Sequence, residues 1–161
     1  MPAHYRFLLV GDGDGRSSLE RLAQDLGIRD RVIFAGHQEN PEAFFSAMDL
    51  CFFSSYAAEG VAQSLVQSLL NGLPVLACRI PSTVEVLKKV EVYQLVDYGD
   101  IPAACKGIFK LASSPGRDPQ QAEQQWHIIA GQYGLQHMIK TLLDTYARFD
   151  IFPPDHDMTM K

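Results

Sequence analysis

The chain has 161 residues, of which 47% are hydrophobic and 20% charged, and its formal net charge is −5. This composition is typical of one globular domain and excludes a disordered chain. The acidic balance, with no long run among the 14 basic residues, argues against a nucleic-acid partner, because contacts to phosphates need clustered Lys and Arg.

Three cysteines lie far apart, at Cys51, Cys78 and Cys105, and no C-x-x-C pair is present. This spacing predicts buried thiols in a reducing compartment rather than zinc or redox chemistry. The first residues lack the pattern of a secretion signal, and no apolar run reaches the ~20 residues that cross a membrane. We therefore expect a cytoplasmic protein, with peripheral contact at the inner face of the membrane left open.

Apolar runs alternate with helical patterns over residues 5–114. Each run is short and is followed by glycine or polar residues, which is typical of strands in a parallel sheet. The predicted strands cover residues 5–11, 31–36, 49–55, 73–78 and 92–100. The predicted helices cover residues 17–27, 40–48, 60–71, 81–90 and 101–114. Ser17 and Glu20 have the spacing of a capping box at the start of the first helix.

The alternation of strands and helices predicts the fold class α/β, with a Rossmann-like parallel sheet and helices on both faces in three layers. From residue 118 the pattern is wholly helical. These C-terminal helices are expected to pack back on the sheet through their larger apolar residues, namely Trp126, Ile129, Tyr133, Met138, Leu142 and Tyr146. We expect one domain over residues 1–161, with a loose tail at 150–161.

The glycine-rich segment after the first strand resembles a dinucleotide-binding loop only in part. Gly11, Gly13 and Gly15 are followed by Arg16 where the third glycine of G-x-G-x-x-G would stand, and the next strand ends in Gly36 instead of an acid. Arg16 also occupies the third acidic position of a calcium loop. We interpret the segment as a tight strand-to-helix turn near a ligand crevice, and a nucleotide-dependent oxidoreductase remains a weaker alternative.

Other catalytic patterns find no support in the sequence. The histidines show no H-x-x-x-H pair, so a metal site is disfavoured. They are His4, His37, His127, His137 and His156. Ser54 and Ser55 end a strand but lack the G-x-S-x-G context of a hydrolase nucleophile.

The helix expected after Glu59 has two interpretations. The backbone amides of Gly60, Val61 and Ala62 are expected to lie free at its start, where a diphosphate would be stabilised. On periodicity alone, the simpler interpretation is an acid that caps the helix, followed by a solvated polar face at Gln63, Gln67 and Asn71.

Five segments in order favour the first interpretation: LLVGDG, DRVIFAG, AMDLCFFSS, EGVAQSLVQSLLNGLPVLA and VEVL. Over about residues 5–149, their order and spacing resemble the nucleotide-sugar-binding half of retaining glycosyltransferases of family 4, which have the GT-B fold. The most specific part is the E-x7-E region, here Glu59 to Gln67.

The resemblance implies a role for each residue at these positions. Glu59 would be the catalytic contact to the transferred sugar, and Gln67 would hold the ribose hydroxyls. Gly36 and His37 would lie near the base. The remaining donor-binding set would be Gly60, Val61 and Ala62 at the diphosphate, together with Gln63, Gly11, Gly13 and Ser82. The resemblance also implies a metal-independent reaction without a cofactor, in which a helix terminus stabilises the departing diphosphate.

Three departures from the family pattern bear on activity. Gln67 replaces the second Glu, which removes a charge but keeps hydrogen-bonding capacity. Pro81 and Ser82 replace paired glycines, which limits how closely the donor approaches the backbone. The chain begins at what resembles the second strand of the donor domain, so the first strand and the acceptor domain are expected to be missing.

We therefore expect the donor half of a glycosyltransferase of bacterial polysaccharide or glycoconjugate synthesis, which is inactive alone. Its expected partners are a nucleotide-sugar and an N-terminal acceptor domain absent from this chain, with membrane contact only through that missing half. The alternative is a non-catalytic α/β module that binds a nucleotide or another protein.

Overall fold

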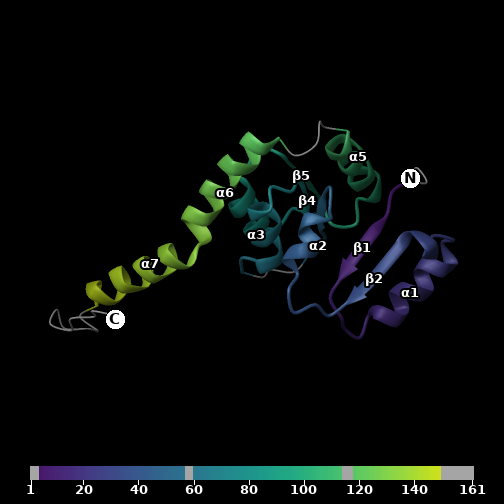
Figure 1. Ribbon diagram of the computed structural model, residues 1–161, viewed down its shortest axis with the longest axis horizontal. Helices are drawn as coiled ribbons and strands as arrows, with labels where there is room; N and C mark the ends of the chain where they lie inside the picture. Colours follow the sequence, from purple (N-terminus) through teal and green to yellow (C-terminus); the bar gives the residue numbers. More distant parts are fainter. Residues whose placement is uncertain (1–3, 57–59, 114–117, 150–161) are drawn as a thin grey trace.

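The computed structural model describes residues 4–56, 60–113 and 118–149 (Figure 1). Glu59 and the tail 150–161 therefore lie outside the described residues. Two parallel sheets form, and helices lie between their strands in the chain. The predicted α/β class, with parallel strands and helices on both sides, is confirmed, although the strands divide into two sheets instead of one.

The first sheet contains two strands. β1 (Phe7–Val10) pairs in parallel with β2 (Val32–Gly36), and α1 (Arg16–Asp25) connects them, with a short 3-10 turn, η1 (Arg29–Arg31), before β2. α1 begins one residue before the predicted capping serine, with Gly15 as N-cap and no side-chain capping bond. The predicted capping box at Ser17 is therefore wrong, because Glu20 instead pairs with Arg16.

The second sheet has the order β3-β4-β5, and all its strands are parallel. Its strands are β3 (Cys51–Phe53), β4 (Val75–Cys78) and β5 (Tyr93–Val96). The helices around it are α2 (Glu42–Ser46), α3 (Gln63–Leu70), α4 (Pro81–Leu87) and α5 (Ile101–Ala112).

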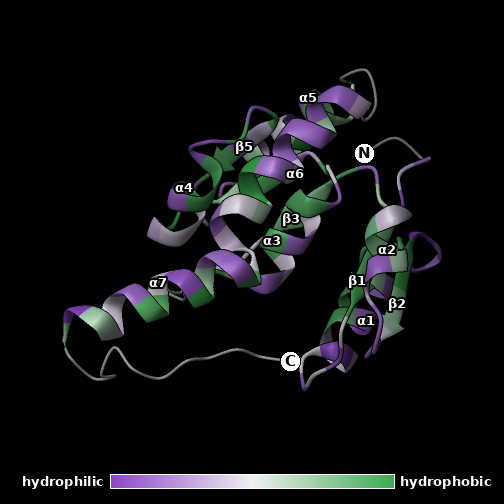
Figure 2. Ribbon diagram, turned by 60° about the vertical axis from the view of Figure 1, so that its left-hand side comes forward, coloured by the Kyte–Doolittle hydropathy of each residue, from purple (hydrophilic) through white to green (hydrophobic). Residues whose placement is uncertain are grey.

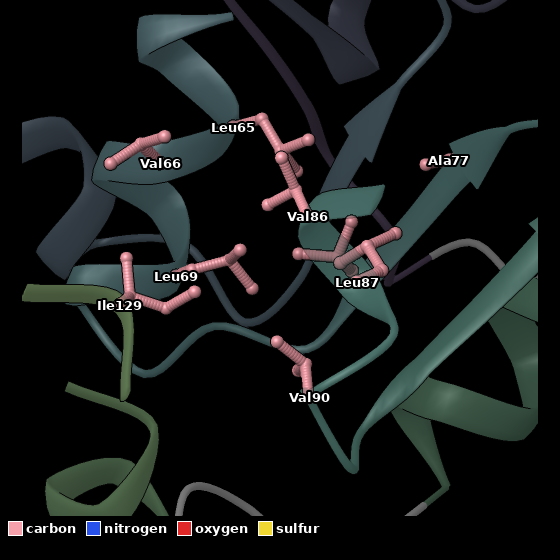
Figure 3. Packing of buried hydrophobic residues seen from close by; sticks show 9 residues of the cluster. Leu65, Val66, Leu69, Ala77, Val86, Leu87, Val90 and Ile129 are labelled. Atoms are coloured by element: carbon pink, nitrogen blue, oxygen red, sulfur yellow. The ribbon is translucent and has the colours of Figure 1, made fainter. Parts of the chain in front are cut away.

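The continuous apolar sequence of β4 explains its central place, because a parallel strand that is covered on both faces has no polar side. Val75 and Ala77 belong to the core cluster formed with α3 and α4. Figure 3 labels Ala77 beside Leu65 of α3 and Val86 and Leu87 of α4. Leu76, which points to the opposite face, belongs to the cluster formed with β5 and α5. The second sheet is thus the middle of three layers.

The helix α6 (Pro119–Tyr133) packs on α3 and extends the layer that α3 forms. Its Ile129 is fully buried in the core cluster, and Gln125 Nε2 donates a hydrogen bond of 2.8 Å to Leu69 O. The close approach needs a glycine, since a Cβ on Gly72 would lie 2.7 Å from Ala122 Cβ. The expected packing of Ile129 is therefore confirmed, with α3 as its immediate neighbour.

The last described helix, α7 (Leu135–Arg148), does not follow the prediction. It has no buried residue, and Met138 and Leu142 are 58% and 46% exposed. Trp126 on α6 is also half exposed. Gly134 has an extended backbone between the two helices, which sends α7 away from the sheet instead of back across it (Figure 1).

Candidate functional site

The carboxyl end of β1–β2 brings two predicted glycines together. Gly11 N donates a hydrogen bond of 2.8 Å to Gly36 O, and the two residues form an isolated bridge where β2 ends and directly after β1. Both have a positive φ, 130° for Gly11 and 70° for Gly36, which glycine adopts without steric cost. His37 follows directly and is exposed. This edge therefore carries three of the residues predicted to hold a donor.

The segment from Gly13 to Arg16 is a tight turn into α1, as the sequence predicted. Gly13 N donates to Asp12 Oδ1 at 3.0 Å, and Arg16 N donates to Gly13 O at 3.1 Å. Asp12 thus accepts a hydrogen bond within the turn, while its side chain remains 55% exposed. Gly13 itself lies on the exposed surface of this loop.

Arg16 connects this turn to β2, a role that the sequence reasoning missed. Its Nε lies 3.1 Å from Glu20 Oε1, and its Nη1 lies 3.9 Å from Asp12 Oδ1. Its Nη2 donates to Phe34 O at 3.5 Å. One available signal was the charge itself, since a cation in the first turn of a helix opposes the helix dipole.

The start of α3 lies three residues later than the sequence suggested. Ala62 is the N-cap, with an extended backbone and no side-chain capping bond, and the helix begins at Gln63. Its first intrahelical bond among those described runs from Val66 N to Ala62 O, at 3.1 Å. The amides without an intrahelical partner therefore shift toward Gln63, while Gly60 and Val61 form the exposed approach to the helix.

The polar residues along α3 differ in what they contact. Gln63 is exposed and Gln67 is half-buried. Asn71 is the C-cap residue, and its Nδ2 donates 2.9 Å to Gln67 O. Asn71 is thus half-buried, and its side chain closes the end of the helix instead of lying on a solvated face.

Contacts with β3 hold α3 in place. Ser68 is fully buried, and its Oγ donates to Leu65 O at 2.8 Å. Burial raises the pKa of the Cys51 thiol on β3, and a hydrogen bond with Ser68 partly offsets this shift. The pair keeps one face of α3 against the sheet, so its first turn stays near the carboxyl end of β3.

The turn after β4 carries the predicted Ser82. α4 begins at Pro81, with Ile80 as N-cap, and Ser82 is half-buried in its first turn. The turn is fixed by Thr83, which is fully buried. Thr83 Oγ1 accepts a hydrogen bond from Ile80 N at 3.1 Å and lies 2.7 Å from Cys78 O, to which it donates. The sequence reasoning did not single out Thr83.

The described site residues thus form two groups. One lies at the end of β1–β2, with Gly11, Gly13, Gly36 and His37, and the other lies where α3 and α4 begin, with Gly60, Val61, Ala62, Gln63, Gln67 and Ser82. Within the described parts of the chain, no hydrogen bond or ion pair joins the two groups. In Figure 2 the β1–β2 sheet stands apart from the second sheet.

Two further structural findings concern the described residues only. No group of three or more His, Cys, Asp or Glu side chains in them could hold a metal ion. None of the described helices combines the length and the apolar character that crossing a membrane requires.

The sequence matches a known family model over most of its length. The model is described as Glycosyl transferases group 1, and it matches residues 2–114. The chain is also 29% identical over 147 residues to the lipopolysaccharide core biosynthesis glycosyltransferase LpsE of Rhizobium meliloti (strain 1021). That alignment covers 91% of this chain and 43% of the relative, so the chain spans less than half of the relative's length.

Solved structures share the fold. The structure of Anabaena Alr3699/HepE in complex with UDP superposes with a TM-score of 0.72 at 21% identity, covering 91% of this chain and 42% of that one. A glycosyltransferase from Rickettsia africae ESF-5 superposes with a TM-score of 0.81 at 18% identity, covering 89% of this chain and 40% of that one. At these identities the likeness concerns the fold alone.

Proposed function

Because the chain belongs to the Glycosyl transferases group 1 family, we propose that it forms the nucleotide-sugar-binding part of a glycosyltransferase. The donor would be a nucleoside-diphosphate sugar, and the product a bacterial polysaccharide or glycoconjugate. The lipopolysaccharide enzyme among the relatives supports the product class, and the UDP complex of the Anabaena protein supports the donor class. The proposal includes the finer assignment to the retaining enzymes of family 4.

The observation that carries the proposal is the start of α3. Its N-cap is Ala62, which offers no side chain to the first amides, and no acidic residue lies in its first described turn. The positive end of the helix dipole and the unpaired amides therefore have no partner from the helix itself, and they favour an anion. A diphosphate has the charge and the oxygen acceptors that such a helix start binds.

Around this diphosphate position we assign the other contacts. Glu59 would accept hydrogen bonds from the hydroxyls of the sugar, and Gln67 would donate and accept at the ribose. Gln67 lies four residues along α3 from Gln63, roughly 6 Å along the helix axis at 1.5 Å per residue. Ser82 would approach the donor from the start of α4.

The second group of residues would receive the base, at Gly36 and His37, with Gly11 and Gly13 bordering the same crevice. In this arrangement the amides at the start of α3 stabilise negative charge on the departing diphosphate. A helix terminus thereby supplies what a cation supplies in other transferases, so we propose a reaction that needs no metal and no cofactor.

The length of the chain limits what it does alone. Since it spans 43% of the Rhizobium meliloti relative, we propose that the acceptor is bound by an N-terminal domain outside this chain. Sugar transfer would then require both parts. Any contact with a membrane-bound acceptor would come through that other domain.

Ligand binding by the purified chain tests the proposal. Isothermal titration with UDP and with UDP-glucose is expected to show saturable binding of both. Gln67→Leu should weaken both by roughly tenfold, because it removes hydrogen bonds to the ribose. Glu59→Ala should weaken the binding of UDP-glucose and leave the affinity for UDP unchanged, because Glu59 is assigned to the sugar alone.

Gln121→Leu is a matched control, because Gln121 is exposed on α6. It should leave both affinities unchanged. If the wild-type chain binds neither ligand, nor GDP or a GDP-sugar, a donor site is contradicted, and a module that binds another protein becomes the better explanation.

A further inference from the structure

Arg16 stands at a position that helix stability does not favour. It is the first residue of α1, and the first turn of that helix contains no acidic residue. A cation there opposes the positive end of the helix dipole. Ion pairs with Glu20 and Asp12 offset this cost, at 3.1 and 3.9 Å. The stability of α1 therefore does not explain why an arginine occupies this position.

The reason lies in the contacts of Arg16 with β2. Three successive carbonyls at the carboxyl end of this strand each accept a hydrogen bond. Phe34 O accepts from Arg16 Nη2 at 3.5 Å, Ala35 O from Gln38 Nε2 at 2.7 Å, and Gly36 O from Gly11 N at 2.8 Å. The end of β2 is thereby tied to α1, to its own following turn and to β1.

Gly36 lies close to this guanidinium, since a Cβ at this position would be 3.2 Å from Arg16 Nη1. Its φ of 70° independently favours glycine. The side chain of Arg16 therefore packs directly on the backbone where the strand turns into residues 36–38. Movement of the guanidinium would free this turn.

We propose that Arg16 is a positioning residue that fixes the turn at residues 36–38, which receives the base of the nucleotide. The proposal rests on the function proposed above, in which Gly36 and His37 border the base. Arg16 itself does not bind phosphate in this scheme. Its guanidinium already faces two carboxylates, which neutralise much of its attraction for an anion.

Two variants of the full chain separate this role from a general structural one. Arg16→Met keeps an apolar stem and removes the charge and the donors. Arg29→Met is the matched control at the opposite end of β2, where Arg29 Nη1 donates to Val32 O at 3.1 Å and the guanidinium lies 5.2 Å from the Phe34 ring centroid.

The first measurement is isothermal titration with UDP and with inorganic pyrophosphate. Arg16→Met should weaken the binding of UDP by about tenfold and leave the affinity for pyrophosphate unchanged, because only binding of the base depends on the turn. Arg29→Met should leave both affinities unchanged. Equal weakening of both ligands by Arg16→Met would overturn the proposal in favour of a direct phosphate contact, and no weakening of UDP would overturn it outright.

The second measurement is hydrogen exchange without ligand, which reports the turn directly. Arg16→Met should accelerate exchange at the Gly11 amide, which donates to Gly36 O in this turn, whereas Arg29→Met should not. Unchanged exchange in Arg16→Met would contradict the positioning role even if UDP binding fell. If the wild-type chain binds neither UDP nor pyrophosphate, the proposed function fails and so does this role; if it binds UDP and Arg16→Met binds equally well, only the role of Arg16 fails.

Discussion

The two sheets of the molecule differ sharply in how completely they are covered. In the second sheet all four residues of β4 are buried, whereas in the first sheet all four residues of β1 are only half-buried. The helices show the same contrast. Leu65, Val66 and Leu69 of α3 are buried, while Leu22 of α1 is 51% exposed.

This contrast arises from the neighbours of each helix, not from its pattern. Both α1 and α3 carry an apolar stripe, but α3 lies between the second sheet and α6, whereas α1 contacts chiefly the short turn η1 among the described elements. An open apolar hollow remains between α1 and the first sheet, lined in part by Leu9, Leu22 and Ala23. The base would therefore be held on the less covered sheet, and the diphosphate on the better covered one.

The prediction with the largest expected effect compares one leucine from each region. Leu69→Ala should lower the free energy of unfolding by about 4 kcal/mol, because Leu69 is fully buried and its loss leaves a cavity in the core. Leu22→Ala on α1 should lower it by less than about 1 kcal/mol. Urea unfolding followed by circular dichroism measures both values. Equal losses would show that the first sheet is packed as tightly as the second.

Replacement of two glycines is expected to have an intermediate effect on stability and tests the same contrast between the sheets. Gly72 and Gly27 have nearly equal positive φ angles, 68° and 65°, so alanine meets the same backbone strain at both. At Gly27 a Cβ would meet nothing within 4 Å, whereas at Gly72 it would lie 2.7 Å from Ala122 Cβ on α6. We expect Gly27→Ala to cost about 1 kcal/mol and Gly72→Ala about 3 kcal/mol, because the second also separates α6 from α3.

Thermal unfolding of both glycine variants measures this difference. The fluorescence of Trp126, the single tryptophan, reports the environment of α6 directly. A shift of the emission in Gly72→Ala but not in Gly27→Ala would agree with local displacement of α6. Equal destabilisation by the two variants would mean that α6 adjusts without cost.

The sequence predicts the second sheet well because its signals are local and mutually consistent. The apolar run of β4 and the stripe of α3 specify burial, and the structure places both in the core. The same reasoning fails for α7, whose apolar residues follow a helical period but remain exposed. A helical stripe shows which face is apolar, and it does not show what covers that face.

Prediction of the candidate site has a similar limit. The glycine-rich turn and its place at the end of β1 follow from the sequence, because glycine and strand signals are local. The start of α3 does not, since helix boundaries depend on capping geometry, and Ala62 gives no capping signal. The sequence patterns identify Arg16 only as the residue that breaks a glycine motif and a calcium-loop pattern, because its contact with Phe34 spans 18 positions of the chain.

The smallest expected effect is a pH dependence that belongs to the second sheet, since β1 and β2 contain no cysteine. Burial raises the pKa of the Cys51 and Cys78 thiols above the ordinary value of 9.0. Above that pH the unfolded chain releases these protons while the folded chain retains them, so the stabilisation is complete below pH 9.0 and is lost as the pH rises through the raised values. Between about pH 8 and about pH 10, the free energy of unfolding measured with urea should therefore fall less in the double variant Cys51→Ala/Cys78→Ala than in the wild type. If the free energy of unfolding falls equally in both proteins, other groups cause the pH dependence and the two thiols do not contribute.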